Sequence, residues 1–137
     1  MPQQAFFDTN ILVYSVDGAD VRKRDLALRL WREHLIAQRA AVSIQVLQEF
    51  YNAATKTVGL DSFKAQLLVE EMAEALVVRL TAKDVIAAIE IHRLHRLSIW
   101  DALILRAASV SGSQVLFTED LQSDRAIAGV RIVNPFL

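Results

Sequence analysis

The sequence predicts an α/β fold in which helices cover both faces of a mostly parallel sheet of about five strands. Short apolar runs, each suited to one buried strand, alternate along the chain with segments long enough for helices. Strands separated in this way cannot be joined by tight hairpins, so they pair mostly in parallel through right-handed crossovers. The four glycines are scattered, which favours helices over a β-sandwich. We therefore expect three layers: helices, sheet and helices.

Length and composition indicate one domain over residues 1–137. A chain of 137 residues, 53% of them hydrophobic, is long enough for one core and too short for two. The net charge of −1 and the apolar content exclude disorder. The lack of cysteine excludes disulfides, a thiolate zinc site and a cysteine nucleophile. Because no apolar run reaches about 18 residues and no signal peptide is recognisable, we expect a cytoplasmic protein with no membrane segment.

The expected strands are the short apolar runs, in chain order Gln4–Phe7, Ala40–Val42, Leu76–Leu80, Gln114–Phe117 and Val130–Val133. In an open parallel sheet, ligands bind beyond the carboxyl ends of the strands, at the point where the strand order reverses. The residues that directly follow these strands are therefore the first candidates for a functional site.

Two long helices are expected before residue 60. The segment Asp20–Gln38 places Leu28, Trp31 and Leu35 on one face. The segment Ile44–Lys56 has a predicted apolar stripe of Ile44, Leu47, Tyr51 and Ala54. Glu49 lies on the opposite, polar face, where an exposed side chain is the ordinary interpretation unless a cleft runs along that face.

Three further helices follow. Asp61 is the expected N-cap of a helix that reaches Glu74 and points Phe63, Leu67 and Leu68 inward. Two capping-box sequences each open a helix, namely Thr81-Ala82-Lys83-Asp84 and Ser98-Ile99-Trp100-Asp101. The segment Ile99–Val110 is apolar almost all round, which predicts a buried helix.

Three aspartates fall where a ligand is expected. Asp8 follows the first strand, Asp101 lies in the first turn of the buried helix, and Asp120 follows the fourth strand, next to Glu119. Each has an ordinary alternative: Asp8 caps the short helix after it, Asp101 completes the capping box of Ser98, and Asp120 lies in a solvated turn. An ionised carboxylate on a buried helix is costly unless it is paired, which favours a functional role for Asp101.

Carboxylates gathered at one edge of a sheet predict a divalent cation. Two carboxylates about 5 Å apart repel each other by roughly 3 kcal/mol at an effective dielectric constant of 20. Three or four of them cannot all stay ionised in a partly dry site without a cation. Ligands that are all oxygen favour Mg²⁺, or Mn²⁺, over zinc, and such ions suit the hydrolysis of phosphate esters.

Four acidic segments occur in a familiar order. They are Phe7-Asp8-Thr9-Asn10-Ile11-Leu12, Gln48-Glu49-Phe50, Trp100-Asp101-Ala102-Leu103-Ile104 and Thr118-Glu119-Asp120-Leu121, and the chain closes with Gly129-Val130-Arg131-Ile132-Val133-Asn134-Pro135-Phe136. Together these segments resemble a PIN-domain ribonuclease, in particular the VapC toxins of bacterial VapBC toxin–antitoxin pairs. The resemblance covers essentially the whole chain.

The resemblance implies a three-layer PIN-like domain whose acidic pocket binds Mg²⁺ or Mn²⁺ and cleaves RNA. It assigns the four catalytic and metal-binding carboxylates to Asp8, Glu49, Asp101 and Asp120. It assigns supporting polar roles to Asn10, Ser43 and Thr118, and it places Glu119 where it would help or replace Asp120. The family often has a further acid shortly after the fourth, whereas this chain has Leu121-Gln122, so the number of metal ions stays open.

The resemblance also implies an RNA substrate, a homodimer and a VapB-type antitoxin that lays a peptide across the groove and offers an arginine to the acidic pocket. Two alternatives stay open: a housekeeping PIN nuclease of RNA maturation, and a catalytically silent PIN-like module that binds RNA or protein. All four acidic positions are present, which favours the enzyme. A phosphatase of the haloacid dehalogenase type is disfavoured because Asp8-Thr9-Asn10 lacks a second aspartate.

RNA binding would depend on local basic segments, because a net charge of −1 supplies no overall attraction. The candidates are Arg22-Lys23-Arg24 and His92-Arg93-Leu94-His95-Arg96, each of which is also an ordinary solvated helix face. His92 and His95 have no third soft ligand nearby, so a metal site there is disfavoured. The large aromatic side chains are expected in the core or at a subunit interface: Trp31, Phe50, Tyr51, Phe63 and Trp100.

Overall fold

The short apolar runs form strands, and the computed structural model, which describes residues 2–137, assembles them into one six-stranded sheet. The strands are β1 (Ala5–Phe7), β2 (Ala40–Ser43), β3 (Leu76–Val78), β4 (Val115–Phe117), β5 (Ala126–Ile127) and β6 (Val130–Val133). Their order across the sheet is β3-β2-β1-β4-β6-β5, and only the β5–β6 pair is antiparallel. The predicted mostly parallel sheet is confirmed.

The sixth strand, β5, is the one that the sequence does not predict. It has two residues and pairs with β6 so that Ile127 lies opposite Val130. The turn between them is Ala128-Gly129, and both residues have positive φ, 53° and 79°. Two-residue hairpins favour such turns, usually with Asn-Gly, Asp-Gly or Gly-Gly. A two-residue strand shows no hydrophobic period, so the expectation that no tight hairpin joins the strands is wrong here.

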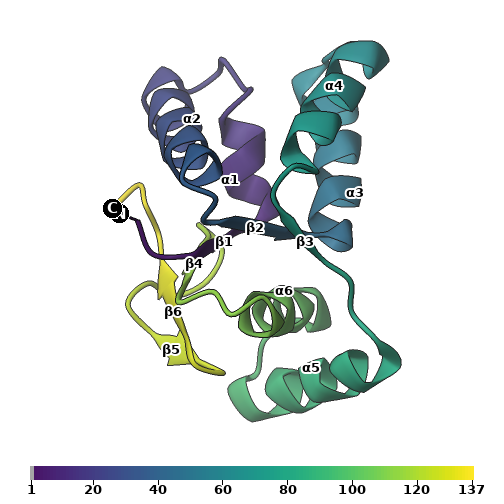
Figure 1. The fold of residues 1–137 in the computed structure, drawn as a ribbon, viewed down its shortest axis with the longest axis vertical. Helices are drawn as coiled ribbons and strands as arrows, with labels where there is room; N and C mark the ends of the chain where they lie inside the picture. Colours follow the sequence, from purple (N-terminus) through teal and green to yellow (C-terminus); the bar gives the residue numbers. More distant parts are fainter. Residues whose placement is uncertain (1) are drawn as a thin grey trace.

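Helices cover both faces of the sheet, as predicted. They are α1 (Thr9–Tyr14), α2 (Val21–Ile36), α3 (Ile44–Ala53), continued by the π-helical turn η1 (Ala54–Val58), then α4 (Ser62–Met72), α5 (Ala82–His95) and α6 (Ile99–Val110). Figure 1 shows α1 to α4 on one side of the sheet and α5 and α6 on the other. Right-handed crossovers explain this division, because the first two connections move across the sheet in one direction and the third returns past β1.

The buried face of α3 differs from the predicted stripe. Val46 and Phe50 are fully buried, whereas Ile44 and Tyr51 are 37% and 39% exposed. Ala54, at the start of η1, is buried as predicted. Large apolar side chains stand on two sides of this helix, so the helical period alone does not decide which side meets the sheet.

The prediction for α4 is correct at its start and for Leu68, which packs against the core, but wrong for Phe63 and Leu67. Asp61 is the N-cap, and its carboxylate accepts a hydrogen bond from the Phe63 backbone N–H at 2.8 Å. The buried residues are Ala65 and Met72, however, while the Phe63 side chain is 78% exposed and Leu67 is 65% exposed. A small alanine therefore faces the core where the sequence suggests an aromatic ring.

The different burial of two phenylalanines is directly testable. Phe50→Ala is expected to lower the free energy of unfolding by about 3–5 kcal/mol, because it removes a fully buried ring. Phe63→Ala is expected to change it by no more than about 0.5 kcal/mol, since that ring is 78% exposed. Urea unfolding followed by circular dichroism measures both. Equal losses would contradict the described orientation of α4.

The helix α6 is buried along most of its length. Its buried residues are Ala102, Ile104, Leu105, Ala107 and Ala108. Trp100 and Val110, near its two ends, are 63% and 45% exposed, so the predicted burial holds for the middle of the helix. Trp31 and Phe50 lie in the core, as expected for these aromatic side chains.

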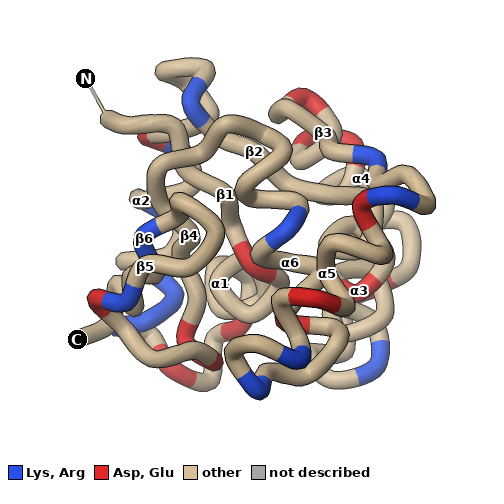
Figure 2. Tube along the Cα trace, turned by 90° about the horizontal axis from the view of Figure 1, so that it is seen from below, with Lys and Arg blue, Asp and Glu red and all other residues tan. Residues whose placement is uncertain are grey.

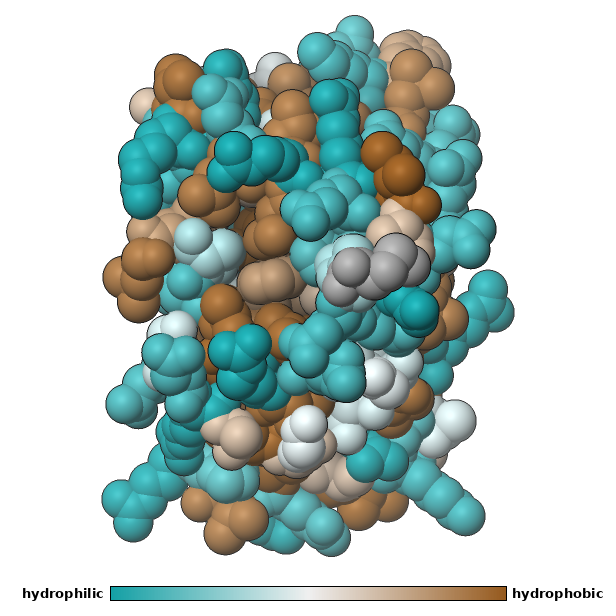
Figure 3. Space-filling model, turned by 60° about the vertical axis from the view of Figure 1, so that its left-hand side comes forward, coloured by the Kyte–Doolittle hydropathy of each residue, from teal (hydrophilic) through white to brown (hydrophobic). Residues whose placement is uncertain are grey.

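Charged and apolar residues are distributed over many elements of the fold. Figure 2 shows Lys and Arg scattered over several elements. Figure 3 shows hydrophilic and hydrophobic side chains interspersed on the face that comes forward there. Within residues 2–137, no helix combines the length and the apolar character that crossing a bilayer would require.

Candidate metal-binding site

The site lies where the order of the strands reverses. From β1 the chain moves outward to β2 and β3, and β4 then pairs with the opposite side of β1. Asp8 directly follows β1, and Thr118 to Asp120 directly follow β4. The helix α6 precedes β4 and returns across the sheet, so its first turn, with Asp101, lies at the carboxyl edge of the strands. Topology alone thus brings three remote segments to one edge.

Asp8, Asp101 and Asp120 form the acidic cluster. Each offers one carboxylate oxygen, and these oxygens all lie within 4.8 Å of one another. Within residues 2–137 it is the one such group of three metal-ligating side chains. Asp8 is buried, Asp101 is half-buried and Asp120 is exposed. The cluster therefore extends from the interior to a solvent-accessible mouth.

Hydrogen bonds hold the Asp8 carboxylate at the base of the cluster. Its Oδ1 accepts from the Thr9 backbone N–H at 2.7 Å, which makes Asp8 the N-cap of α1. Its Oδ2 accepts from the Thr118 hydroxyl at 2.8 Å and from the Asn10 amide at 3.4 Å. The capping interpretation of Asp8 and a role in the cluster are therefore compatible, because the two oxygens have different partners.

Asn10 and Thr118 connect the loops after β1 and β4. The Asn10 amide nitrogen donates to the Thr118 hydroxyl at 3.3 Å, and its carbonyl oxygen accepts from the Glu119 backbone N–H at 3.2 Å. The Thr118 hydroxyl also accepts from the Asp120 backbone N–H at 3.1 Å. Both side chains therefore lie beside the Asp8 carboxylate and link the two loops.

Burial and mutual repulsion oppose ionisation of the acidic cluster. Burial raises the pKa of Asp8 from 3.8 to about 6, and the charges of Asp120 and Asp101 add to the rise, although hydrogen bonds from Thr118 and Thr9 oppose it. Burial also raises the pKa of Asp101, as does the charge of Asp120. At neutral pH the cluster is negatively charged at an energetic cost, which a bound cation would offset.

Only the serine half of the capping box that was predicted at the start of α6 is present. The Ser98 hydroxyl accepts from the Asp101 backbone N–H at 3.1 Å, so the serine half of the predicted capping box is present. Within residues 2–137 the reciprocal bond from the Ser98 backbone to the Asp101 side chain is missing. In the other capping box the bond exists, since Asp84 accepts from the Thr81 backbone N–H at 2.9 Å.

Comparisons with known proteins agree with this geometry. The model of one protein family, described as the PIN domain, matches residues 5–127. The chain belongs to the PIN-domain family. A comparison with curated protein sequences gave no match.

Solved structures share the fold of this PIN domain. The Mycobacterium tuberculosis VapC20, described as a sarcin–ricin loop cleaving toxin, superimposes with a TM-score of 0.68 at 22% identity, over 85% of this chain and 91% of that one. A toxin–antitoxin complex from Klebsiella pneumoniae gives 0.69 at 22% identity, over 96% and 97%. FitAcB from Neisseria gonorrhoeae gives 0.63 at 16% identity, over 96% and 98%.

Glu49 and Ser43 of this PIN domain lie outside the group of three. Glu49 is exposed, and its Oε1 accepts from the Thr9 hydroxyl at 2.9 Å and from the Gln45 amide at 3.4 Å. Since Thr9 adjoins Asp8, Glu49 stands at the rim of the acidic cluster. The Ser43 hydroxyl accepts from the Val46 backbone N–H at 3.3 Å and thus caps α3.

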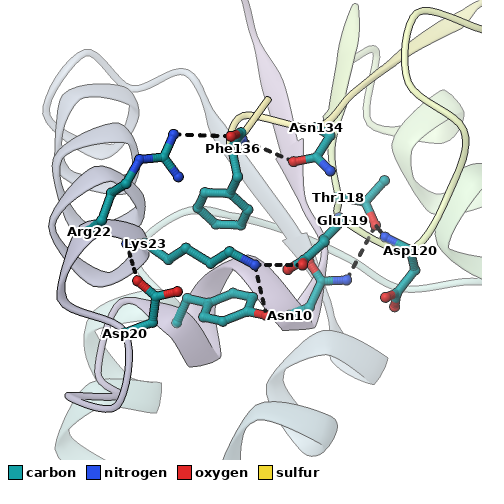
Figure 4. Close-up of polar contacts among 10 residues, drawn as sticks. Asn10, Asp20, Arg22, Lys23, Thr118, Glu119, Asp120, Asn134 and Phe136 are labelled. Carbon is teal, nitrogen blue, oxygen red and sulfur yellow. Dashed lines mark hydrogen bonds and ion pairs between the residues drawn. The ribbon is translucent and has the colours of Figure 1, made fainter.

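Glu119 points to a different partner from the one that the resemblance implies. Its carboxylate forms an ion pair with the Lys23 ammonium at 2.7 Å. Figure 4 shows Lys23 extending from α2 to Glu119, whereas the Asp120 carboxylate lies apart from this ion pair. Glu119 therefore does not contribute to the acidic cluster in this arrangement.

Four other residues of the two basic segments, Arg22, Arg24, His92 and His95, have contacts within the fold. Arg22 donates to the Phe136 carbonyl at 3.1 Å, and Arg24 pairs with its neighbour Asp25 at 3.3 Å. The His92 ring contacts the Leu97 carbonyl, and the His95 ring lies 3.3 Å from the Arg125 guanidinium. The two histidines thus have separate partners.

A pocket of about 390 Å³ adjoins the acidic cluster. Its walls come from α1, α3 and the loop after β4, and they include Thr9, Asn10, Val13, Tyr14, Ala53 and Asp120. Sequence reasoning did not find Val13, Tyr14 or Ala53, because their side chains carry no chemical signal and only the packing of α1 beside α3 brings them there.

Proposed function

We propose that this PIN domain is a divalent-metal-dependent endoribonuclease and the toxin of a toxin–antitoxin pair. The observation that carries the proposal is the meeting of Asp8, Asp101 and Asp120 at the reversal point of a PIN-family sheet. Two of the similar structures are described as a sarcin–ricin loop cleaving toxin and a toxin–antitoxin complex, which supports the same function here.

The donor set suits Mg²⁺ or Mn²⁺. All three groups of the acidic cluster are carboxylates, and hard oxygen ligands favour these ions over zinc. Asp8, Asp101 and Asp120 would hold the ion. When bound, it would supply Lewis-acid activation of the phosphoryl group and of the attacking water.

Hydrogen bonds within the protein would orient the carboxylates that bind the ion and the water. Asp8 would act as a deprotonated ligand, kept in one orientation by its bonds to Thr9, Thr118 and Asn10. Glu49 would orient a water, or bind a second ion, through its Oε2, because Oε1 already accepts from Thr9 and Gln45. Thr9 would thus link the two carboxylates, because its hydroxyl donates to Glu49 and its backbone N–H donates to Asp8.

The RNA backbone would contact the end of α5. Arg93 and Arg96 are exposed there, and the chain then turns directly into the first turn of α6, where Asp101 lies. By contrast, Arg22 and Lys23 are already engaged with Phe136 and Glu119. Phosphate contacts of arginine would position the RNA without specifying its sequence.

Residues 1–137 would form a single domain that acts as a homodimer and is inhibited by an antitoxin. An arginine of the antitoxin placed in the acidic cluster would neutralise Asp8, Asp101 and Asp120 as a cation does. Inhibition would follow because the antitoxin arginine and the metal ion would compete for the same carboxylates.

Mapping of RNA 5′ ends after brief expression in bacteria tests the function. Wild-type protein is expected to produce new 5′ ends and to arrest growth, whereas Asp8→Asn is expected to produce neither. Rescue of growth by the product of a small adjacent gene would support a toxin, and cleavage without growth arrest would favour RNA maturation. Identical 5′ ends from wild type and Asp8→Asn would contradict the nuclease proposal and favour a silent binding module.

A further inference from the structure

The Lys23 ammonium lies between two aromatic rings and an acid. Its Nζ is 4.7 Å from the centre of the Tyr14 ring and 5.1 Å from that of Phe136, and the two rings meet edge to face at 5.1 Å. It donates to Glu119 at 2.7 Å and to the Tyr14 hydroxyl at 3.4 Å. These contacts fix the end of a long side chain that is otherwise flexible.

The residue after Glu119 has no comparable support of its own. Asp120 lies in an irregular loop, is exposed, and within residues 2–137 its carboxylate accepts no hydrogen bond. Its backbone N–H donates to the Thr118 hydroxyl at 3.1 Å, and Glu119 directly precedes it in the chain. The ion pair between Lys23 of α2 and Glu119 is therefore one of the side-chain contacts that hold the chain beside Asp120, together with the Thr118 hydroxyl and the packing of Leu121 (Figure 4).

We propose that Lys23 is a positioning residue for Asp120: acting through Glu119, it sets the affinity of the acidic cluster for a divalent cation. This inference rests on the proposed function, since it concerns the same cluster. It extends that function to residues of α2 and of the carboxyl-terminal segment, which lie outside the four acidic motifs.

The direction of the effect separates positioning from simple electrostatics. Loss of a positive charge near three carboxylates would, by Coulomb's law alone, strengthen cation binding. Loss of an anchor for Asp120 would weaken it. A Lys23 variant without charge therefore has opposite effects in the two cases, and the sign of the change is decisive.

Calorimetric titration of the full chain with Mn²⁺ and no RNA measures this sign. Lys23→Met keeps an unbranched side chain between the two rings and removes the ammonium. It is expected to weaken Mn²⁺ binding by about 10-fold, the lower end of the losses seen when residues that orient metal ligands are replaced. Lys83→Met, at an exposed position on α5, removes the same charge and is expected to change the affinity less than about twofold.

A double-mutant cycle tests whether Lys23 acts through Glu119. In a Glu119→Gln background, Lys23→Met is expected to weaken Mn²⁺ binding much less than in wild type. An equal loss in both backgrounds, tighter binding in Lys23→Met, or a lower melting temperature with an unchanged affinity would each overturn the inference. Wild-type protein that binds no Mn²⁺ at millimolar concentration would instead overturn the proposed function itself.

A second pair of variants covers the case in which Lys23→Met does not fold. Glu119→Gln and Glu119→Ala remove the same charge, but only glutamine can still accept a hydrogen bond from Lys23. The loop stays attached in both, because the Thr118 backbone N–H donates to the Val133 carbonyl at 3.1 Å and Leu121 packs against the core. Weaker Mn²⁺ binding in Glu119→Ala than in Glu119→Gln supports positioning, and equal binding overturns it.

Discussion

Replacing Asp8 with asparagine is expected to lower the rate of Mg²⁺-dependent RNA cleavage by at least about 100-fold. Loss of a residue that only orients a metal ligand costs 10- to 100-fold in many metal sites, so loss of the most buried ligand should cost at least as much. The substitution keeps the shape of the side chain and removes its charge. Single-turnover cleavage of a radiolabelled RNA by purified protein measures the rate.

The same substitution should not unfold the protein. Asparagine leaves an oxygen that can accept from the Thr9 backbone N–H, and it removes a buried charge, so the metal-free melting temperature at pH 8 is expected to rise. Asp25→Asn, at an exposed position on α2, is the matched control and should cleave within about twofold of wild type. Full activity in Asp8→Asn would contradict the assignment of Asp8 as a metal ligand.

The acidic cluster was predictable because it depends on chain order. Asp8 and Asp120 each follow a parallel strand, and Asp101 opens the helix that returns to the next strand. Any sheet with this order of strands and crossovers brings such positions to one edge, whatever the details of packing. Short-range features of the sequence, strand ends and helix starts, were therefore sufficient to find three residues that the fold brings together.

The partners of Glu119 and Glu49 were not predictable in the same way. Lys23 lies 96 residues before Glu119, and Thr9 lies 40 residues before Glu49. No periodicity relates such positions, because the contacts depend on how α2 and α3 are oriented on the sheet. The charge of a residue is also a poor guide to its partner. Lys23 belongs to a basic segment that suggests RNA binding, but its ammonium forms an ion pair with Glu119.

The buried faces of α3 and α4 were not predictable for a related reason. Each helix has large apolar side chains on more than one side, and Phe63 and Leu67 are left exposed while Ala65 is buried. Hydrophobic periodicity identifies a helix but ranks its faces only when one of them is polar. Here the packing of α3 against α4 and against the sheet leaves Ala65, and not Phe63, in the core.

Metal-free stability is expected to fall as the pH rises from about 4 to about 6. Asp8 has a pKa of about 6 in the folded protein against 3.8 as the reference, so in this interval the folded state binds more protons than the unfolded state. The difference corresponds to about 3 kcal/mol, which is present as a full penalty above pH 6. Other carboxylates titrate in the same range, so the change due to Asp8 is the difference between wild type and Asp8→Asn, measured by urea unfolding at several pH values in EDTA.

Mn²⁺ should remove this penalty, because it binds the ionised cluster only in the folded state. At a free concentration 100 times its dissociation constant, it is expected to add about 2.7 kcal/mol to the stability of the wild type near pH 7.5, and much less to that of Asp8→Asn. A stability that is indifferent to Mn²⁺ would contradict the metal site, and equal stabilisation of both proteins would place the bound ion elsewhere. The ionised carboxylates of the acidic cluster would then lower the stability of the metal-free protein and raise that of the metal-bound protein. Both effects would come from the negative charge of the cluster.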